Sequence, residues 1–298
     1  MVPESEKRYA RSYRLLKPAA IDRMEDTPEH HRTRSDFVRL FVQRQVCVHT
    51  ASDSHEKAVP RTMMQFWHAR DQIPSDVVNC MESWKRLAHR GFRYLLFDRS
   101  DARDFISQRL GGRYTAAFDL CYHPAMLSDY FRLCFMLTEG GFYIDADDVY
   151  AGGNVEDLFS DARLKLQPLC YDIATESMVS PSLFADAVNH SPDWIYYLNN
   201  NPLIAPPHHP VVSNALEAAT SRLEHIADNS LPEIQSTTGP GNLTKSLFEL
   251  AQECPGIEST VRVMWDWDSI GSTKWHLSYR NDSRNWRLSN QRQHRDAE

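Results

Sequence analysis

The sequence has no apolar stretch long enough to cross a bilayer, and this absence narrows where the protein acts. A spanning helix needs about 20 consecutive apolar residues, and no run approaches that length. The opening segment, MVPESEKRYARSYRLLKP, is charged where a signal peptide carries an apolar core. We therefore expect a cytoplasmic protein whose only contact with a membrane is peripheral.

The sequence also lacks an excess of basic residues. Its 33 Lys and Arg against 40 Asp and Glu give a formal net charge of −7. Sequence-independent binding to nucleic acid depends on a positive surface, so we exclude nucleic acid and retain small anions such as nucleotides. The six cysteines form no CxxC pair, which favours reduced thiols over a disulfide framework. No P-loop, GxGxxG, HExxH or GxSxG motif is present.

What the sequence does contain is enough apolar material for one large domain. Hydrophobic residues make up 42% of the 298 positions, which suffices to enclose a sizeable core. Residues 1–58 are polar and predict an accessory N-terminal segment, whose apolar patch at 37–42 fits either a docking helix or a strand. We expect the main domain over 59–286 and a polar C-terminal tail over 287–298.

Short apolar runs alternate with helical periodicity along the main domain. This alternation of strands and helices predicts an α/β fold. The expected strands cover 61–67, 92–97, 142–144 and 261–264. The expected helices cover 75–90, 124–139, 211–227 and 242–252.

Three aspartates follow the 142–144 strand directly, as Asp145, Asp147 and Asp148. Carboxylates held this close repel one another unless a cation neutralises them, and hard oxygen ligands suit Mg²⁺ or Mn²⁺. On an extended backbone Asp145 and Asp147 point the same way, so both can face one ion. The alternative is a solvated acidic turn, and a second DxD at 266–268 shows how readily the bare pattern arises.

The residues around the first DxD give it context. They form two short patterns on either side of a helix: Ser128-Asp129-Tyr130-Phe131-Arg132, and Gly140-Gly141-Phe142-Tyr143-Ile144-Asp145-Ala146-Asp147. In these the sequence resembles the DXD sugar-transferase family, that is, the glycosyltransferase family 32-like enzymes that include the yeast initiating mannosyltransferases. It resembles more distantly the catalytic domain of the clostridial glucosylating toxins. The resemblance extends over 59–286, with Met64 standing where members often carry His. It implies a GT-A fold, a Rossmann-like mixed sheet flanked by helices.

The resemblance also implies roles for residues that would bind the donor. Trp67 would stack on the nucleotide base, a contact that contributes about 1–3 kcal/mol in stacking platforms. Asp129 and Arg132 would grip the sugar hydroxyls and the diphosphate, since a guanidinium suits phosphate oxygens. Asp145 would contact the donor ribose or sugar and bear on the metal indirectly. The catalytic set implied is Asp129, Arg132, Asp145 and Asp147.

Later residues complete the implied site. Asp147 would hold the metal, and His276 is the candidate for a third metal or diphosphate contact. Ser283 and Trp286 would close over the donor as a lid. A metal contact from Asp148 is left open.

The activity that the resemblance implies is a metal-dependent, retaining transfer of a hexose from a UDP- or GDP-linked donor, with Mn²⁺ or Mg²⁺ as cofactor. The expected acceptor is a saccharide, glycolipid or glycan. One alternative is a toxin-like transferase that glycosylates a protein, with 1–58 as its docking arm, and another is a nucleotide-sugar binding module. A metal-dependent phosphohydrolase is a weaker alternative, because the Thr that such phosphatases place after their DxD is missing.

Overall fold

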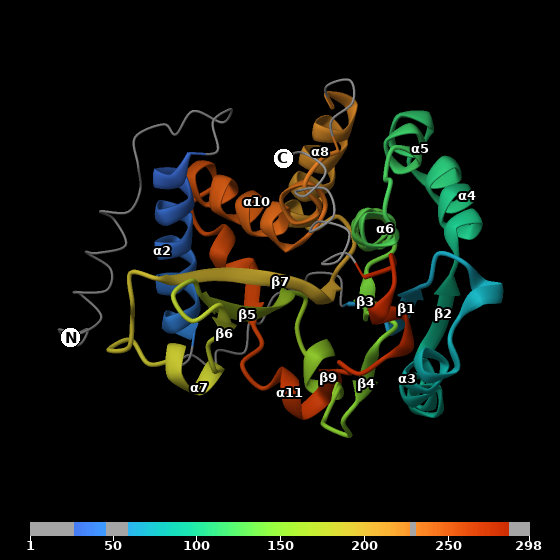
Figure 1. The fold of residues 1–298 in the computed structure, drawn as a ribbon, viewed down its shortest axis with the longest axis horizontal. Coiled ribbons are helices and arrows are strands. Elements are labelled where there is room, and N and C mark those ends of the chain that lie inside the picture. Colours follow the sequence, from blue (N-terminus) through green and yellow to red (C-terminus); the bar gives the residue numbers. More distant parts are fainter. Residues whose placement is uncertain (1–26, 46–58, 227–230, 286–298) are drawn as a thin grey trace.

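The computed structural model describes residues 27–45, 59–226 and 231–285. Within them a mixed seven-stranded sheet carries helices on both faces (Figure 1). The strand order is β2-β1-β3-β7-β5-β6, with β8 paired to β5. β1 is parallel to β2 and β3, while β7 is antiparallel to both β3 and β5. This arrangement confirms the expected α/β class and its mixed, helix-flanked sheet.

The bounds of the elements are as follows. The strands are β1 (Thr62–Phe66), β2 (Arg93–Phe97), β3 (Gly141–Tyr143), β4 (Asp148–Tyr150), β5 (Leu164–Asp172), β6 (Ser177–Met178), β7 (Trp194–Ala205), β8 (Val261–Val263) and β9 (Gly271–Thr273). The α-helices are α2 (Pro28–Gln45), α3 (Ser75–Lys85), α4 (Arg99–Arg109), α5 (Gly112–Asp119), α6 (Pro124–Thr138), α7 (Pro181–Phe184), α8 (Pro210–Glu224), α9 (Ile234–Thr237), α10 (Pro240–Glu253) and α11 (Trp267–Ile270). The 3₁₀ helices are η1 (Arg70–Gln72), η2 (Arg86–Arg90), η3 (Glu156–Phe159), η4 (Ile257–Thr260) and η5 (Ser278–Asn281).

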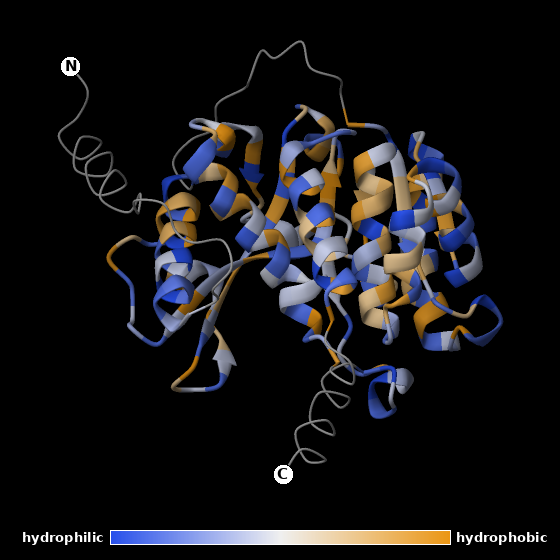
Figure 2. Ribbon diagram, turned by 90° about the horizontal axis from the view of Figure 1, so that it is seen from above, coloured by the Kyte–Doolittle hydropathy of each residue, from blue (hydrophilic) through white to orange (hydrophobic). Residues whose placement is uncertain are grey.

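Two hydrophobic cores lie on opposite faces of the sheet, because side chains alternate along each strand. Met64 and Tyr143 belong to the larger core, whereas their neighbours Met63 and Phe142 belong to the smaller one. Figure 1 shows α4, α5, α6, α8 and α10 on one side of the sheet, with α3, α11 and the β4–β9 pair on the other. Figure 2 shows the helical layer from above, with hydrophilic and hydrophobic residues interleaved along each helix. Such interleaving is typical of helices that bury one face.

The connection from α6 to β3 is defined by its end residues. His123 caps the helix by accepting a hydrogen bond from the backbone N–H of Ala125 at 3.0 Å, and Pro124 occupies the first turn. The helix ends before Gly141, whose φ of 116° and close approach to the Thr62 carbonyl oxygen leave no room for a side chain. A Cβ there would lie 2.5 Å from that oxygen. The helix therefore enters β3 through a tight turn that only glycine can adopt.

The expected elements of the first half are found, but the helix expected over 75–90 is α-helical only as far as Lys85, in α3, and continues as the 3₁₀ helix η2. The strands at 61–67, 92–97 and 142–144 correspond to β1, β2 and β3, and the helix at 124–139 to α6. In the second half, α8, α10 and β8 match the three elements expected there. α4, α5, β5 and β7 carry no sequence prediction, although β7 is the longest strand of the sheet. No helix among the described residues is long and apolar enough to span a membrane.

The apolar patch at 37–42 lies in a helix. Phe37, Val38, Phe41 and Val42 of α2 are buried in the larger core, where Phe37 packs edge-on against Phe248 of α10. This part of the N-terminal segment thus packs with the sheet and its helices. The boundary at 58/59 and the accessory role of 1–58 stay predictions, and the tail at 287–298 lies outside the described residues.

The buried His209 predicts a loss of stability in mild acid. It caps α8 by accepting from the N–H of Val211 at 3.2 Å, and burial lowers its pKa from 6.5 to about 4. Below pH 6.5 the His209 ring therefore binds a proton in the unfolded chain but not in the folded protein. Stability is thus lost as pH falls from 6.5 towards 4. Between pH 7 and pH 5 we expect His209 to cost about 2 kcal/mol of unfolding free energy.

Urea denaturation at both pH values tests this. His209→Asn keeps a capping acceptor but does not titrate, so the variant should lose less stability between pH 7 and pH 5 than the wild type. Equal losses in the two proteins would contradict the assignment.

Candidate active site

Arg132 of α6 lies at the centre of the candidate site. Its guanidinium is 3.0 Å from the carboxylate of Asp129 on the same helix and 2.9 Å from that of Asp145 beyond β3. It also donates to the carbonyl oxygen of Asn200 in β7 and lies 3.9 Å from the ring centre of Tyr143. Only 4% of the Arg132 side chain is exposed. One buried cation therefore joins α6, β3 and β7 at this point.

Asp129 is held from three sides. It accepts a hydrogen bond from the Asn200 amide at 2.8 Å, and the Thr238 hydroxyl also bonds to it. Burial raises its pKa to about 6, although Arg132 opposes the rise. Gly239 closes over the carboxylate, since a Cβ there would lie 3.2 Å from Asp129 Oδ2. Asp129 and Arg132 form an ion pair whose two side chains are enclosed by the protein, and their contact with a donor stays a prediction.

The DxD residues lie in a turn between β3 and β4 rather than on the strand itself. The turn is closed by the N–H of Asp148 donating to the carbonyl oxygen of Asp145 at 3.2 Å. Asp147 accepts a hydrogen bond from the hydroxyl of Tyr279 at 2.6 Å and pairs with Arg280. Burial and the charge of Asp145 raise the pKa of Asp147, and Arg280 opposes this. Two arginines thus neutralise the turn from two sides.

Asp148 is bound by side chains from β7 and β9. It is fully buried and accepts hydrogen bonds from the Asn201 amide at 2.9 Å and the Thr273 hydroxyl at 2.7 Å. Burial and the neighbouring carboxylates raise its pKa to about 8. Asn201 also accepts from the N–H of Asp145 at 2.9 Å. Asn201 therefore clamps both ends of the turn.

The oxygen atoms of the turn fit a hard divalent cation. Asp145 uses Oδ1 for Arg132 and Tyr143, and Asp147 uses Oδ2 for Tyr279 and Arg280. The second oxygen of each carboxylate accepts nothing from another residue in the described chain. Magnesium in proteins is held by one or two carboxylates together with substrate phosphates and water, which matches this partial donor set. No group of three His, Cys, Asp or Glu gathers for a metal in the part of the chain that is described.

Of the other expected site residues, Trp67 lies beside the DxD turn, whereas His276 is exposed. Trp67 is 8% exposed and packs in one cluster with Ala146 of the turn, edge-on to the ring of Tyr279. His276 is exposed in the loop between β9 and η5, and it does not join Asp145 and Asp147 in a metal-binding group. The Ser283 carbonyl bonds to His123 at 3.0 Å, which ties this segment to the start of α6. Trp286 lies outside the described residues.

Three contributors to the site carried no predicted role. These are Asn201, which bonds to Asp145 and Asp148, and the pair Tyr279 and Arg280, which bond to Asp147. Both of the latter reach Asp147 across more than 130 positions of sequence. No local spacing signals such a contact, so only the folded chain reveals it.

The candidate site is thus a turn of carboxylates that lies beside a buried arginine, at the end of a central strand. Residues 74–159 match the family model described as a glycosyltransferase sugar-binding region containing a DXD motif. The match includes Asp129, Arg132, Asp145 and Asp147, and it confirms the resemblance inferred from the sequence. This part of the chain is therefore similar to the DXD-containing sugar-binding region of glycosyltransferases.

Other comparisons add little. A second family model, described as a CAP N-terminal conserved motif, matches residues 216–245. No curated protein matches the chain significantly. One solved structure, described as PaToxG Glycosyltransferase, is 14% identical over 85% of this chain and 82% of its own, with a TM-score of 0.44. A similarity this low does not establish a shared fold or activity.

Proposed function

We propose that this protein is a metal-dependent, retaining glycosyltransferase of GT-A type that moves a hexose from a UDP- or GDP-linked donor to a saccharide, glycolipid or glycan. The observation that carries the proposal is the meeting of Asp129, Arg132 and Asp145 within 3.0 Å, with Asp147 in the same turn. All four residues lie in the region that matches the glycosyltransferase model. We place the activity in the cytoplasm.

The chain's residues divide the work of holding the donor. Arg132 and Arg280 together bind three carboxylates, and Asp145 is the most accessible of these because 33% of its side chain is exposed. Asp145 therefore meets the donor first. Asp147, with Asp145 beside it, would hold Mn²⁺ or Mg²⁺. When bound, that ion supplies positive charge against the donor diphosphate. Arg132 keeps Asp129 and Asp145 in place, and its buried charge adds to the positive field at the leaving group.

The same arrangement supports retention of configuration. As the bond from the sugar to the diphosphate stretches, the anomeric carbon gains positive character and the diphosphate gains negative charge. The acceptor hydroxyl then attacks from the face that the diphosphate leaves, and a departing phosphate oxygen takes its proton. A double displacement through an aspartate is the competing route. Arg132 binds both nearby aspartates and so lowers their strength as nucleophiles, which favours the first route.

Trp67 is the proposed contact for the nucleotide base. Its cluster includes Ala146, between the two DxD aspartates, so a base on the indole would lie beside the diphosphate site. Its ring nitrogen is buried and has no hydrogen-bond partner in the part of the chain that the structure describes. Ser283, Trp286 and His276 are proposed as parts of a late loop that closes over the donor.

A thermal-shift panel tests the proposal. UDP-glucose, UDP-galactose, UDP-N-acetylhexosamine and GDP-mannose are each added with and without Mn²⁺. One donor should raise the melting temperature only when Mn²⁺ is present, because a ligand at 100 times its Kd stabilises by about 2.7 kcal/mol. A panel in which no donor shifts the wild type with Mn²⁺ would contradict the proposal. A protein acceptor in later product analysis would instead support the toxin-like alternative.

A further inference from the structure

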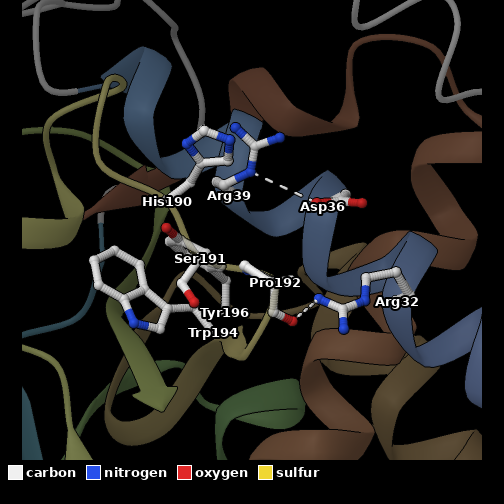
Figure 3. A pocket seen from close by; sticks show the side chains of 8 residues that line it. All are labelled: Arg32, Asp36, Arg39, His190, Ser191, Pro192, Trp194 and Tyr196. Atoms are coloured by element: carbon white, nitrogen blue, oxygen red, sulfur yellow. Dashed lines mark hydrogen bonds and ion pairs between the residues drawn. The ribbon is translucent and has the colours of Figure 1, made fainter. Parts of the chain in front are cut away.

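A cavity lies far from the DxD turn, between α2 and the start of β7. Its volume is about 430 Å³, within the range of small-molecule pockets. Figure 3 shows side chains from both elements and from the preceding loop lining it. Along β7, Trp194 at the cavity and Asn200 at the candidate active site are six positions apart, which is about 20 Å of strand. The cavity is therefore distinct from the proposed donor site.

The hydroxyl of Tyr196 is an unsatisfied polar group at this cavity. Tyr196 is 3% exposed and lines the cavity, and its hydroxyl has no hydrogen-bond partner among the described residues. Leaving a buried hydroxyl unpaired costs about 1–3 kcal/mol. The chain does not relieve this cost, although Arg39 and Asp36 lie within electrostatic reach of the hydroxyl. A ligand group placed in the cavity would satisfy it.

The charges around the cavity favour an anion. Two arginines, Arg32 and Arg39, line it against the single carboxylate of Asp36, and His190 lines it as well. Arg39 meets Asp36 only through Nε, at 3.6 Å, so its two terminal nitrogens have no partner among the described residues. Figure 3 shows the His190 ring beside the Arg39 guanidinium. Phosphate oxygens accept hydrogen bonds from such guanidinium forks.

The walls of the cavity are fixed and partly aromatic. The N–H of Tyr196 donates to the Ser35 hydroxyl of α2 at 3.0 Å, and the Trp194 indole donates to Asp172 at 3.3 Å. The Trp194 and Tyr196 rings lie 6.3 Å apart. Aromatic faces pack against the C–H groups of sugar rings, and a carboxylate such as Asp36 accepts from sugar hydroxyls. The cavity thus offers donors to an anion and a surface to a ring.

We propose that this cavity binds a sugar phosphate. The phosphate contacts Arg39, His190 and the Tyr196 hydroxyl, while the ring lies against Trp194 with a hydroxyl donating to Asp36. The volume suits one hexose phosphate rather than a whole nucleotide sugar. Occupancy of this site does not depend on the DxD turn.

Calorimetry on the full-length protein tests this with three probes: glucose 6-phosphate, inorganic phosphate and glucose. We expect glucose 6-phosphate to bind the wild type at least tenfold more tightly than either of the other two. Tyr196→Phe and Arg39→Gln should each weaken that binding at least tenfold. Arg103→Gln, which removes an exposed guanidinium paired with Asp119 elsewhere, should not. Asp147→Asn should also bind like the wild type.

The melting temperature without ligand provides the second readout. Tyr196→Phe should leave it unchanged or raise it, because the variant removes a hydroxyl that has no partner. A clear fall would mean that the hydroxyl has a structural role, and this would overturn the proposal. Equal affinities for glucose 6-phosphate and inorganic phosphate would overturn the ligand class. Unchanged affinity in both cavity variants would overturn the site.

Discussion

Replacing Asp147 with Asn is expected to lower the turnover of a nucleotide-sugar donor by about 10²–10³-fold or more. Asn has the shape of Asp and keeps an oxygen for the Tyr279 hydroxyl, which donates at 2.6 Å to Asp147. It lacks the negative charge that a divalent cation requires of its ligand. Release of UDP or GDP, measured by a coupled assay with saturating Mn²⁺, gives the turnover.

The second DxD provides a matched control. Asp268 follows the same pattern but is exposed at α11, far along the chain from the β3–β4 turn. Asp268→Asn should turn over the donor like the wild type. The melting temperatures of both variants should stay close to that of the wild type. Full activity in Asp147→Asn would contradict the assignment of Asp147 to the active site.

Replacing Arg132 with Met is expected to cost about 3–5 kcal/mol of unfolding free energy, because it leaves buried carboxylates without their countercharge. The Asp129 side chain is only 10% exposed, and Arg132 is the nearest cation to both Asp129 and Asp145. Activity should be lost as well, even at temperatures where the variant is folded. Urea denaturation gives the stability change, and donor turnover at low temperature gives the activity.

Arg103→Met is the control for this prediction. The Arg103 guanidinium pairs with Asp119 at 2.9 Å, but both side chains are well exposed. Exposed ion pairs contribute little to stability because water screens them. The control should therefore unfold and turn over like the wild type. If Arg132→Met were as stable as that control, the buried charge cluster would not be what organises the site.

Local patterns were sufficient for the elements that carry the family motifs. α6 could be predicted because Pro124 starts it, apolar residues recur at helical spacing, and Gly140 and Gly141 end it. β1, β2 and β3 are short apolar runs bounded by polar or glycine residues. The pairing of Asp129 with Arg132 follows from their spacing of three on one helix. These features depend on residues close together in the sequence.

The strands β5 and β7 could not be predicted in the same way. Pro168 interrupts β5 and coincides with a shift of its register against β7. β7 runs from aromatic residues into Asn199, Asn200, Asn201 and Pro202, a composition typical of turns. Tertiary contacts override this preference for a turn, because Asn200 bonds to Asp129 and Asn201 bonds to Asp148. The polar residues interrupt the strand pattern because they build the site.

The charge balance of the DxD turn also depended on the fold. The sequence predicts that a divalent cation neutralises the aspartates. It gives no sign that Arg132 pairs with Asp145, or that Arg280 pairs with Asp147 from a loop more than 130 residues away. A metal ion at Asp147 would therefore compete with a cation that the chain itself supplies.

The most direct test of the central claim is analysis of the reaction products. The wild-type protein is incubated with the donor identified by thermal shift and a saccharide acceptor, and NMR follows the anomeric configuration of the hexose. With Mn²⁺ we expect the nucleoside diphosphate and a glycosidic or free hexose that keeps the donor's configuration, and with a chelator in place of Mn²⁺ we expect neither. An inverted product, or the same rate with the chelator, would contradict a metal-dependent retaining transfer at this site.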